Sequence, residues 1–428
     1  MPTGTRSTGS CRTACTVLAL LSGLAVLAGQ AGAAEKKRAR ELGLVPLIGG
    51  TPGALDSITD VAGVEVGQTT LVSGEGRLVV GKGPVRTGVT VVHPRGRTNG
   101  DPVFGAWFTL NGNGEMTGTT WLQESGFLEG PVAITNTHSV GIVRDAILQW
   151  QASRPGLQPW GLPVVAETWD GVLNDINGFH LKAEHAIAAL DAARGGPVAE
   201  GNVGGGVGMI CHEFKGGIGT ASRRTADADG GFTVGALVQA NYGSRELLRI
   251  DGVPVGQHIP TSEIQSPWDA EEIANAARIE ADPSLSSTRI GPGGGSIIVI
   301  LATDAPLLPH QCERLAQRAT LGLGRMGSIA SNGSGDILIA FATGNRGLAR
   351  GATERDPRAA VATRMLVDKA ISPLFQAAVE AVEAAVVAAL LAGETLTGRD
   401  GITAHRLEHD RLLDIMARYG RGPRAKAS

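Results

Sequence analysis

Short apolar runs of strand length, most of them rich in Val and Ile, recur along the chain and are separated by Gly and Pro. This composition and these boundaries predict β-strands. The predicted strands cover residues 89–92, 132–135, 164–167, 232–240, 297–302 and 337–342. Each run is too short for the apolar face of a typical helix, so we expect these segments to form the sheets of the protein.

Longer segments with apolar residues at helical spacing alternate with the predicted strands. They predict helices over residues 139–151, 181–193, 309–322, 358–371 and 373–391. Ser139 is a candidate N-cap of the first helix, and the last two segments form a long Ala-rich pair near the C-terminus. Strands that alternate with helices predict a layered α/β or α+β fold.

Residues 243–295 interrupt this alternation. The stretch contains several Pro residues, includes a charged segment at residues 269–282, and ends in the run Gly291-Pro292-Gly293-Gly294-Gly295. Compact domains rarely carry a connection of this length without a function, so we interpret it as a long surface excursion. It ends directly before Ser296.

The N-terminus has the layout of a secretory signal peptide. Arg6 and Arg12 precede an apolar run over residues 17–28, and Ala31-Gly32-Ala33 supplies the small residues of a cleavage site. The alternative, a membrane anchor, needs a longer apolar run. We therefore expect residues 1–33 to be removed and the mature protein to be exported, either to the periplasm or out of the cell.

The composition narrows the function further. The chain of 428 residues has a formal net charge of -3 and no basic tract, so nothing in it favours nucleic acid as a partner. We expect the mature form to have no membrane contact. Two cysteines, Cys211 and Cys312, follow the signal segment. Export permits a disulfide, but two isolated cysteines in a large chain are more often buried thiols. No CxxC pair suggests zinc, and we expect no metal and no cofactor.

The candidate chemistry begins at the end of the Gly-rich run, where Ser296 opens a strand of the buried type. If the Gly295–Ser296 bond breaks, Ser296 gains a free α-amine, whose reference pKa is about 7.7–8.0. Such an amine can take the proton from the hydroxyl of the same serine and act as the general base. Taken alone, these residues also fit an ordinary Gly-rich loop that enters a strand.

Three other polar segments lie at the ends of predicted strands. The run Ser331-Asn332-Gly333-Ser334-Gly335-Asp336 precedes one strand, and its small residues can approach a reacting centre closely. Glu167 ends another strand and Asp170 follows it, with Trp169 between them, and acids at this place suit recognition of a cationic amine. Asn241 follows a third strand and has an amide that can donate to an oxyanion. Each segment alone also fits a turn or a solvated loop.

Taken together and in their order along the chain, the segments resemble the family of L-aminopeptidase/D-amidases and β-peptidyl aminopeptidases. These are self-cleaving peptidases with an N-terminal serine. The resemblance covers most of the mature chain. It also rests on the motifs Gly88-Val89-Thr90, Asn202-Val203-Gly204-Gly205-Gly206, Cys211-His212-Glu213-Phe214-Lys215-Gly216-Gly217, Ala302-Thr303-Asp304-Ala305-Pro306-Leu307 and Thr397-Gly398-Arg399-Asp400-Gly401.

The resemblance implies an α/β fold, a four-layer αββα sandwich like that of N-terminal-nucleophile hydrolases but with different connectivity. It implies cleavage before Ser296, so that residues 34–295 form a larger subunit and residues 296–428 a smaller one. It further implies that the two subunits stay together and that such pairs form a homo-oligomer. The implied reaction is hydrolysis of N-terminal residues from short peptides, amino-acid amides or esters through an acyl-enzyme.

Residue roles follow from the same resemblance. Ser296 matches the nucleophile, and Ser334 matches a second serine beside it. Asp336 stands where some members carry Glu. Asn241 matches the oxyanion-stabilising Asn, and Glu167 matches the acid near the amino end of the substrate.

Two departures from the family pattern concern the substrate site. Trp169, the other candidate substrate-binding residue, stands where a relative has Tyr, so any role of that hydroxyl is lost. The segment between Asn241 and Ser296 is longer than usual, which leaves the pocket rim and the substrate preference open.

Alternative functions fit the sequence less well. Acyltransferases of the ornithine acetyltransferase type also self-cleave, but they typically use Thr and work in the cytosol, whereas this chain has Ser296 and an export signal. A non-catalytic binding protein on the same scaffold requires a lost nucleophile. The glycine runs at 204–208 and 291–295 lack the Lys-Ser or Lys-Thr of a phosphate loop. The run His405-Arg406-Leu407-Glu408-His409 has zinc-peptidase spacing but no clear third ligand, so a solvated helix face is the better interpretation.

Overall fold

The computed structural model of the protein describes residues 37–44, 49–281, 295–348, 358 and 360–422. The predicted signal peptide, the Gly-rich residues 291–294 and residue 359 of a predicted helix lie outside these residues.

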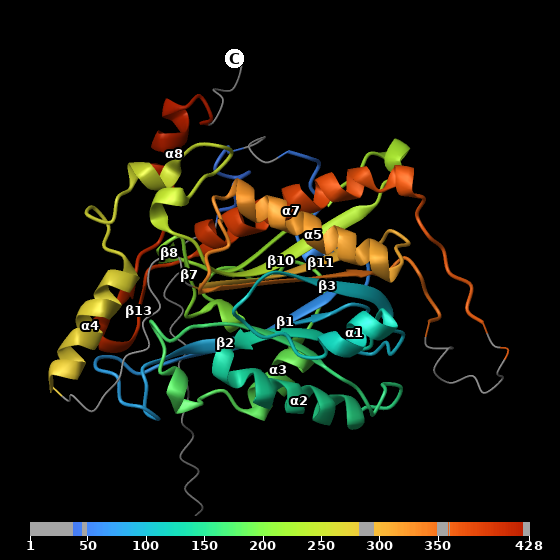
Figure 1. Cartoon of the computed structure of the whole chain (residues 1–428), viewed down its shortest axis with the longest axis horizontal. Helices are drawn as coiled ribbons and strands as arrows, with labels where there is room; N and C mark the ends of the chain where they lie inside the picture. Colours follow the sequence, from blue (N-terminus) through green and yellow to red (C-terminus); the bar gives the residue numbers. More distant parts are fainter. Residues whose placement is uncertain (1–36, 45–48, 282–294, 349–357, 359, 423–428) are drawn as a thin grey trace, which may run out of the picture. The chain divides into compact units, whose positions relative to one another are not determined.

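Two β-sheets form the centre of the fold (Figure 1). The smaller sheet has the order β1-β2-β5-β6, with bounds Glu65–Ser73, Val85–His93, Val132–Asn136 and Val164–Thr168. The larger sheet has the order β4-β3-β12-β11-β10-β9, with bounds Phe127–Leu128, Val103–Gly112, Ser334–Ala342, Gly295–Thr303, Thr233–Asn241 and Gly217–Arg224. The pairs β5–β6 and β11–β12 are parallel, and the other neighbours are antiparallel. All six predicted strands are confirmed.

Helices cover the outer faces of both sheets. Helices α5 (Pro309–Arg325) and α7 (Ser372–Ala392) pack on the larger sheet, and α2 (Val140–Ala152) and α3 (Ala183–Ala192) pack on the smaller one (Figure 1). The predicted four-layer αββα sandwich is therefore confirmed. The described chain also contains the helices α1 (Thr119–Ser125), α4 (Pro267–Ala281) and α8 (His409–Arg418) and the short hairpins β7–β8 (Ile210–Cys211 with Phe214–Lys215) and β13–β14 (Leu396–Thr397 with Thr403–Ala404).

Strand β11 shows how the layers are held together. Ile297, Val299 and Leu301 pack toward α5 and α7. Ile298 and Ile300 point the other way and pack between the two sheets. Successive side chains of a strand point to opposite faces, so a strand that is buried on both sides is apolar at every position. This is the physical reason for the continuous apolar run that predicted the strand.

Helix α7 is apolar enough to resemble a membrane span by composition. Together with the preceding turn it covers Asp368–Ala392, but 83% of its most apolar window is buried within the protein. The helix packs on α5 and on strands β9 and β10. We therefore interpret it as a core helix of the sandwich.

The predicted helix over residues 358–371 is wrong. Residues 360–367 are not helical, and only a short 3-10 turn forms, at Asp368–Ala370. The backbone of this segment bonds to other parts of the fold instead: Leu366 N–H donates to Pro306 O at 3.0 Å, and Arg364 N–H donates to Asn345 Oδ1 at 2.7 Å. These tertiary hydrogen bonds take the place of the helical ones.

The interpretation of residues 243–295 as a surface excursion is also wrong for the first half of the stretch. Leu248, Ile250, Val255 and Ile259 are buried in the core cluster that contains α5 and α7. The charged segment forms α4, and residues 282–294 lie outside the described residues. The Pro-rich composition concealed apolar residues that fold back onto the sandwich.

Two smaller predictions need correction as well. Ser139 occupies the N-cap position of α2, but in the described structure its side chain makes no capping hydrogen bond. The motif at 405–409 is not a helix face, because α8 begins only at His409. His409 Nε2 instead lies 2.9 Å from Leu391 O, which ties the start of α8 to the end of α7.

Candidate active site

Three strands of the larger sheet have their ends at one place, and each end carries a predicted site residue. Strand β10 ends at Asn241, which lies directly opposite Ser296 at the start of β11. Strand β12 begins at Ser334, which pairs with Gly295 in the parallel register. Neighbouring strands lie about 4.8 Å apart, so the fold gathers these residues although they are distant in sequence.

The smaller sheet brings Glu167 and Trp169 to the same place. Asn241 Nδ2 donates to Trp169 O at 2.9 Å, which joins the end of β10 to the end of β6. A Cβ added to Gly114 would lie 3.2 Å from Glu167 Oε1 and 3.2 Å from Gly335 Cα, so the carboxylate lies close beside the start of β12. The structure thus brings all the predicted site residues to one end of the sandwich.

The Gly295–Ser296 junction has an unusual local geometry. Gly295 has φ +125, and a Cβ added to it would lie 2.1 Å from Asn241 O. Only glycine tolerates both this backbone conformation and this close approach. Ser296 is buried, and its Oγ donates to Gly295 O at 2.7 Å. The serine hydroxyl therefore lies against the carbonyl group that precedes it.

The amide of Asn241 is held from two sides. Its Oδ1 accepts from Ile210 N–H at 2.8 Å, and its Nδ2 donates to Trp169 O. An amide nitrogen carries two N–H donors, so one remains for another acceptor. Because Asn241 lies opposite Ser296 in the sheet, this donor is suited to an oxyanion formed at that serine.

Ser334 and Asp336 form a buried hydrogen-bonded pair on β12. Ser334 Oγ donates to Asp336 Oδ1 at 2.5 Å, whereas Asp336 Oδ2 has no hydrogen-bond partner among the described residues. Burial raises the pKa of Asp336 from 3.8 to about 6, opposed by the hydrogen bonds from Ser334 and from the Ile297 N–H. A carboxylate with a pKa near neutrality can exchange a proton with a neighbouring hydroxyl or amine.

Glu167 is a buried acid whose carboxylate accepts hydrogen bonds from two donors. Its Oε1 accepts from Glu115 N–H at 3.0 Å, and its Oε2 accepts from the hydroxyl of Thr137. Burial raises the pKa of Glu167, and the two hydrogen bonds lower it by less. A cationic group beside this carboxylate would stabilise its ionised form.

Trp169 is half-buried and stacks on an aromatic residue that sequence reasoning did not select. Its ring lies 6.3 Å from that of Trp268 on α4, with the two planes inclined by 9°. Thr137, Ile210 and Trp268 all contact predicted site residues and were missed. No local motif marks them, because each acts on a residue that is far away in the chain.

Metal and disulfide chemistry receive no support from the part of the chain that the structure describes. There, no group of three or more His, Cys, Asp and Glu side chains is placed to hold a metal ion. Cys211 and Cys312, for which the sequence left a disulfide open, are buried free thiols.

Comparison with known proteins decides the family. The profile of Peptidase family S58 matches residues 56–404. This chain belongs to peptidase family S58. A β-peptidyl aminopeptidase, BapA of Sphingosinicella microcystinivorans, is 50% identical over 409 residues, which cover 95% of this chain and 98% of the relative.

Solved structures agree with this membership. A β-aminopeptidase from a Burkholderia species matches with a TM-score of 0.75 and 48% identity, covering 90% of this chain and 99% of that chain. The L-aminopeptidase D-Ala-esterase/amidase of Ochrobactrum anthropi, a prototype serine aminopeptidase with a variant of the Ntn hydrolase fold, matches with a TM-score of 0.76 and 42% identity, covering 90% and 99%. The S58 chain described here is accordingly an aminopeptidase/amidase, and acyl transfer is not favoured.

Proposed function

We propose that this S58 chain cleaves itself before Ser296 and then uses Ser296 as an N-terminal nucleophile. One observation carries the proposal: Ser296 Oγ lies 2.7 Å from Gly295 O, at a strand start directly opposite Asn241. A hydroxyl that contacts the carbonyl group of the preceding residue is placed for attack on the carbon of that carbonyl.

Self-cleavage proceeds as an acyl shift from nitrogen to oxygen. Ser296 Oγ bonds to the carbonyl carbon of Gly295, the Gly295–Ser296 C–N bond breaks, and the hydroxyl proton passes to the released nitrogen. Water then hydrolyses the ester, which leaves a carboxylate on Gly295 and a free α-amine on Ser296. The free N–H of Asn241 stabilises the oxyanion that forms at each stage.

Catalysis repeats the same chemistry on a substrate. The α-amine of Ser296 takes the proton from Oγ, the acyl-enzyme forms on Ser296, and water releases it. The Ser334–Asp336 pair orients the amine and hydroxyl of the nucleophile, as supported by its position at the start of the neighbouring strand. Metal chemistry is not required in this scheme.

The substrate is a short peptide, amide or ester with a free amino terminus. Support comes from Glu167, a buried carboxylate that is suited to an ammonium group. The β-peptidyl aminopeptidases among the relatives support N-terminal β-amino acids as one substrate class.

After cleavage the two subunits remain together. Strand β12 and all of β11 except Gly295 belong to the smaller subunit, and they lie between β10 and β3 of the larger one. The two pieces are thus interleaved within one sheet, and separation would break hydrogen bonds along two complete strand pairs. We extend the proposal to a homo-oligomer of these pairs, which size-exclusion chromatography with light scattering would test.

The protein is exported before it acts. The proposal rests on the basic start, the apolar run and the Ala31-Gly32-Ala33 site. Cell fractionation should find the enzyme in the periplasm or medium with an N-terminus near Ala34. Soluble cytoplasmic enzyme that keeps residues 1–33 would contradict export without affecting the catalytic proposal.

The test of the nucleophile uses Ser296→Ala beside Ser328→Ala, a control near the end of α5. Wild type and the control should give a fragment that begins at Ser296, and both should hydrolyse aminoacyl p-nitroanilides. Ser296→Ala should remain one chain without activity. A fragment that starts elsewhere, or substantial activity of Ser296→Ala, would reject the proposal.

A further inference from the structure

Lys215 is a buried lysine on the β7–β8 hairpin. Its Nζ donates to the backbone oxygens of Gly206 at 3.1 Å, Met209 at 2.9 Å and Gly216 at 2.8 Å. A neutral amine has two N–H donors and an ammonium has three, so three acceptors match the charged form. The cation therefore stands within a cage of carbonyl oxygens.

One of these carbonyls connects the cation to the candidate active site. Met209 O and Ile210 N–H belong to the same peptide unit, and that N–H donates to Asn241 Oδ1 at 2.8 Å. A trans peptide is planar, and its C=O and N–H point in opposite directions. Lys215 therefore holds one side of the peptide unit while Asn241 accepts a hydrogen bond from the other.

The same contact determines which way the amide of Asn241 faces. With Oδ1 bound to Ile210 N–H, Nδ2 donates to Trp169 O and keeps one further N–H. A flipped amide would place Oδ1 against Trp169 O and Nδ2 against an N–H donor, which replaces both hydrogen bonds by repulsion. The peptide N–H of Ile210 therefore keeps an N–H of Asn241 available on the strand opposite Ser296.

We propose that Lys215 is a positioning residue that acts on the oxyanion through Asn241. Its positive charge polarises the Met209–Ile210 peptide, and this peptide in turn polarises the amide of Asn241. Hydrogen bonds in series strengthen one another, and bonds to a charged donor are the stronger kind. The free N–H of Asn241 thereby becomes a better donor to negative charge. This inference rests on the oxyanion role given to Asn241 in the proposed function.

A matched control exists at the opposite end of the larger sheet. The buried guanidinium of Arg95 donates to Thr343 O at 3.1 Å and to Asn345 O and Pro102 O. It is therefore another cation that is bound by backbone carbonyls. Arg95→Met should lower stability as Lys215→Met does, but it should leave kcat unchanged.

The experiment is a double-mutant cycle on the full chain. Lys215→Met, Lys215→Gln, Asn241→Ala and the combinations with Asn241→Ala are compared by kcat and KM per molecule of matured enzyme. Matured enzyme is counted by mass spectrometry of the fragment that begins at Ser296. Where maturation is incomplete, the rate of self-cleavage replaces kcat, because in the proposed function the same N–H of Asn241 stabilises the oxyanion that forms on the Gly295 carbonyl.

Lys215→Met should lower kcat about tenfold with little change in KM, and Lys215→Gln should lower it less. In the Asn241→Ala background the same Lys215 substitutions should change kcat by less than about twofold, because the amide through which Lys215 acts is then missing. Equal effects in both backgrounds, no effect in either, or failure of both Lys215 variants to fold while Arg95→Met folds would each overturn the inference. Full activity of Asn241→Ala would instead overturn the oxyanion assignment of the proposed function.

Discussion

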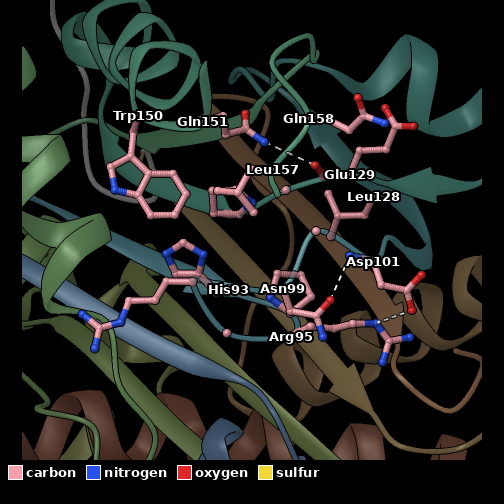
Figure 2. Close-up of a pocket in the computed structure, with 16 residues that line it drawn as sticks. His93, Arg95, Asn99, Asp101, Leu128, Glu129, Trp150, Gln151, Leu157 and Gln158 are labelled. Carbon is pink, nitrogen blue, oxygen red and sulfur yellow. Dashed lines mark hydrogen bonds and ion pairs between the residues drawn. The ribbon is translucent and has the colours of Figure 1, made fainter. Parts of the chain in front are cut away.

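The two ends of the larger sheet are built from the same strands but treat buried polar groups differently. At the end where β3 begins, Arg95 donates to backbone oxygens and lies 3.6 Å from Asp101. Figure 2 shows this end, with Arg95 beside Asp101 and with His93 facing Trp150. At the other end, Asp336 is buried with one oxygen that has no partner among the described residues. The first arrangement stabilises the fold, whereas the second leaves groups available for chemistry.

Both ends of the larger sheet bury titratable groups. The Arg95 end contains a cavity of about 30 Å³, which has room for little more than water. His93 there has a buried Nε2 without a described partner, but burial lowers its pKa to about 4, so it is neutral at pH 7. At the Ser296 end, burial raises the pKa values of Asp336 and Glu167 instead. At both ends burial disfavours the charged form, and at the Ser296 end the groups affected are acids beside the proposed nucleophile.

The largest expected effect concerns the backbone of the Ser296 end. Gly295→Ala places a Cβ 2.1 Å from Asn241 O at φ +125, so the Gly295 carbonyl must move away from Ser296. Self-cleavage should slow roughly 10³-fold or more, because strain and misplacement act together. The appearance of the two fragments on a denaturing gel measures the rate. Gly324→Ala on α5, where an added Cβ meets nothing within 4 Å, should mature normally. Normal maturation of Gly295→Ala would refute the interpretation that only glycine at this position keeps the carbonyl in place for attack by Ser296.

The next effect tests the acid that is contributed by the smaller sheet. Glu167→Gln should lower kcat/KM for free-amine peptides about 10²-fold, because the buried ammonium group of the bound substrate loses the carboxylate that pairs with it. N-acetylated analogues, which we expect to be poor substrates, should be affected much less. Glu129→Gln, at the Arg95 end, is the matched control and should change neither. Similar losses on free and acetylated peptides would show that Glu167 does not bind the substrate amine.

The third effect concerns the stability of the fold, which the buried acid Asp336 at the Ser296 end lowers near neutral pH. Asp336 has a pKa of about 6 in the folded protein against 3.8 ordinarily, so folding binds its proton more tightly. The stabilising contribution of Asp336 to the free energy of unfolding is fully present below pH 3.8. It declines as the pH rises and is lost above about pH 6. In the Ser296→Ala chain, Asp336→Asn should therefore raise the free energy of unfolding at pH 8 by up to about 3 kcal/mol.

Urea denaturation of the intact chains at pH 8 and at low pH measures this difference. The gain from Asp336→Asn should shrink steadily as the pH falls. Asp145→Asn, which changes an exposed carboxylate, should show no comparable gain at any pH. A gain that is absent at pH 8, or that grows toward low pH, would mean that Asp336 is not a destabilised buried acid.

The smallest effect concerns the side chain of Trp169. Asn241 bonds to the backbone oxygen of this residue, and the indole stacks on Trp268. Trp169→Tyr keeps the backbone bond and an aromatic ring, so kcat should stay within about threefold and KM should change modestly. Kinetics on a series of aminoacyl p-nitroanilides would measure both. A tenfold loss in kcat would mean that the indole itself takes part in the reaction.

The sequence by itself predicted the layered fold, six of the ten strands in the two described sheets, and the strand ends at which the polar site residues lie. Strands that are buried on both faces must be apolar at every position, so runs such as 297–302 identify themselves. Strand ends are where polar residues can meet, and Ser296, Ser334 and Asn241 lie at three of them. The failed helix over 358–371 shows the limit of this reasoning, because tertiary bonds such as Arg364 N–H to Asn345 Oδ1 overrode its helical pattern.

Only the tertiary structure decided how the site residues are held. Asn241 is oriented by a peptide N–H that lies 31 positions away, and Glu167 by a hydroxyl 30 positions away. Lys215 gains its connection to Asn241 because β7 of the β7–β8 hairpin packs against β10. A backbone N–H is the same in every residue except proline, so no local pattern reveals which one will orient the amide of Asn241. Which N–H takes this role depends on which distant segment the fold places beside Asn241, and this is decided only when the chain folds.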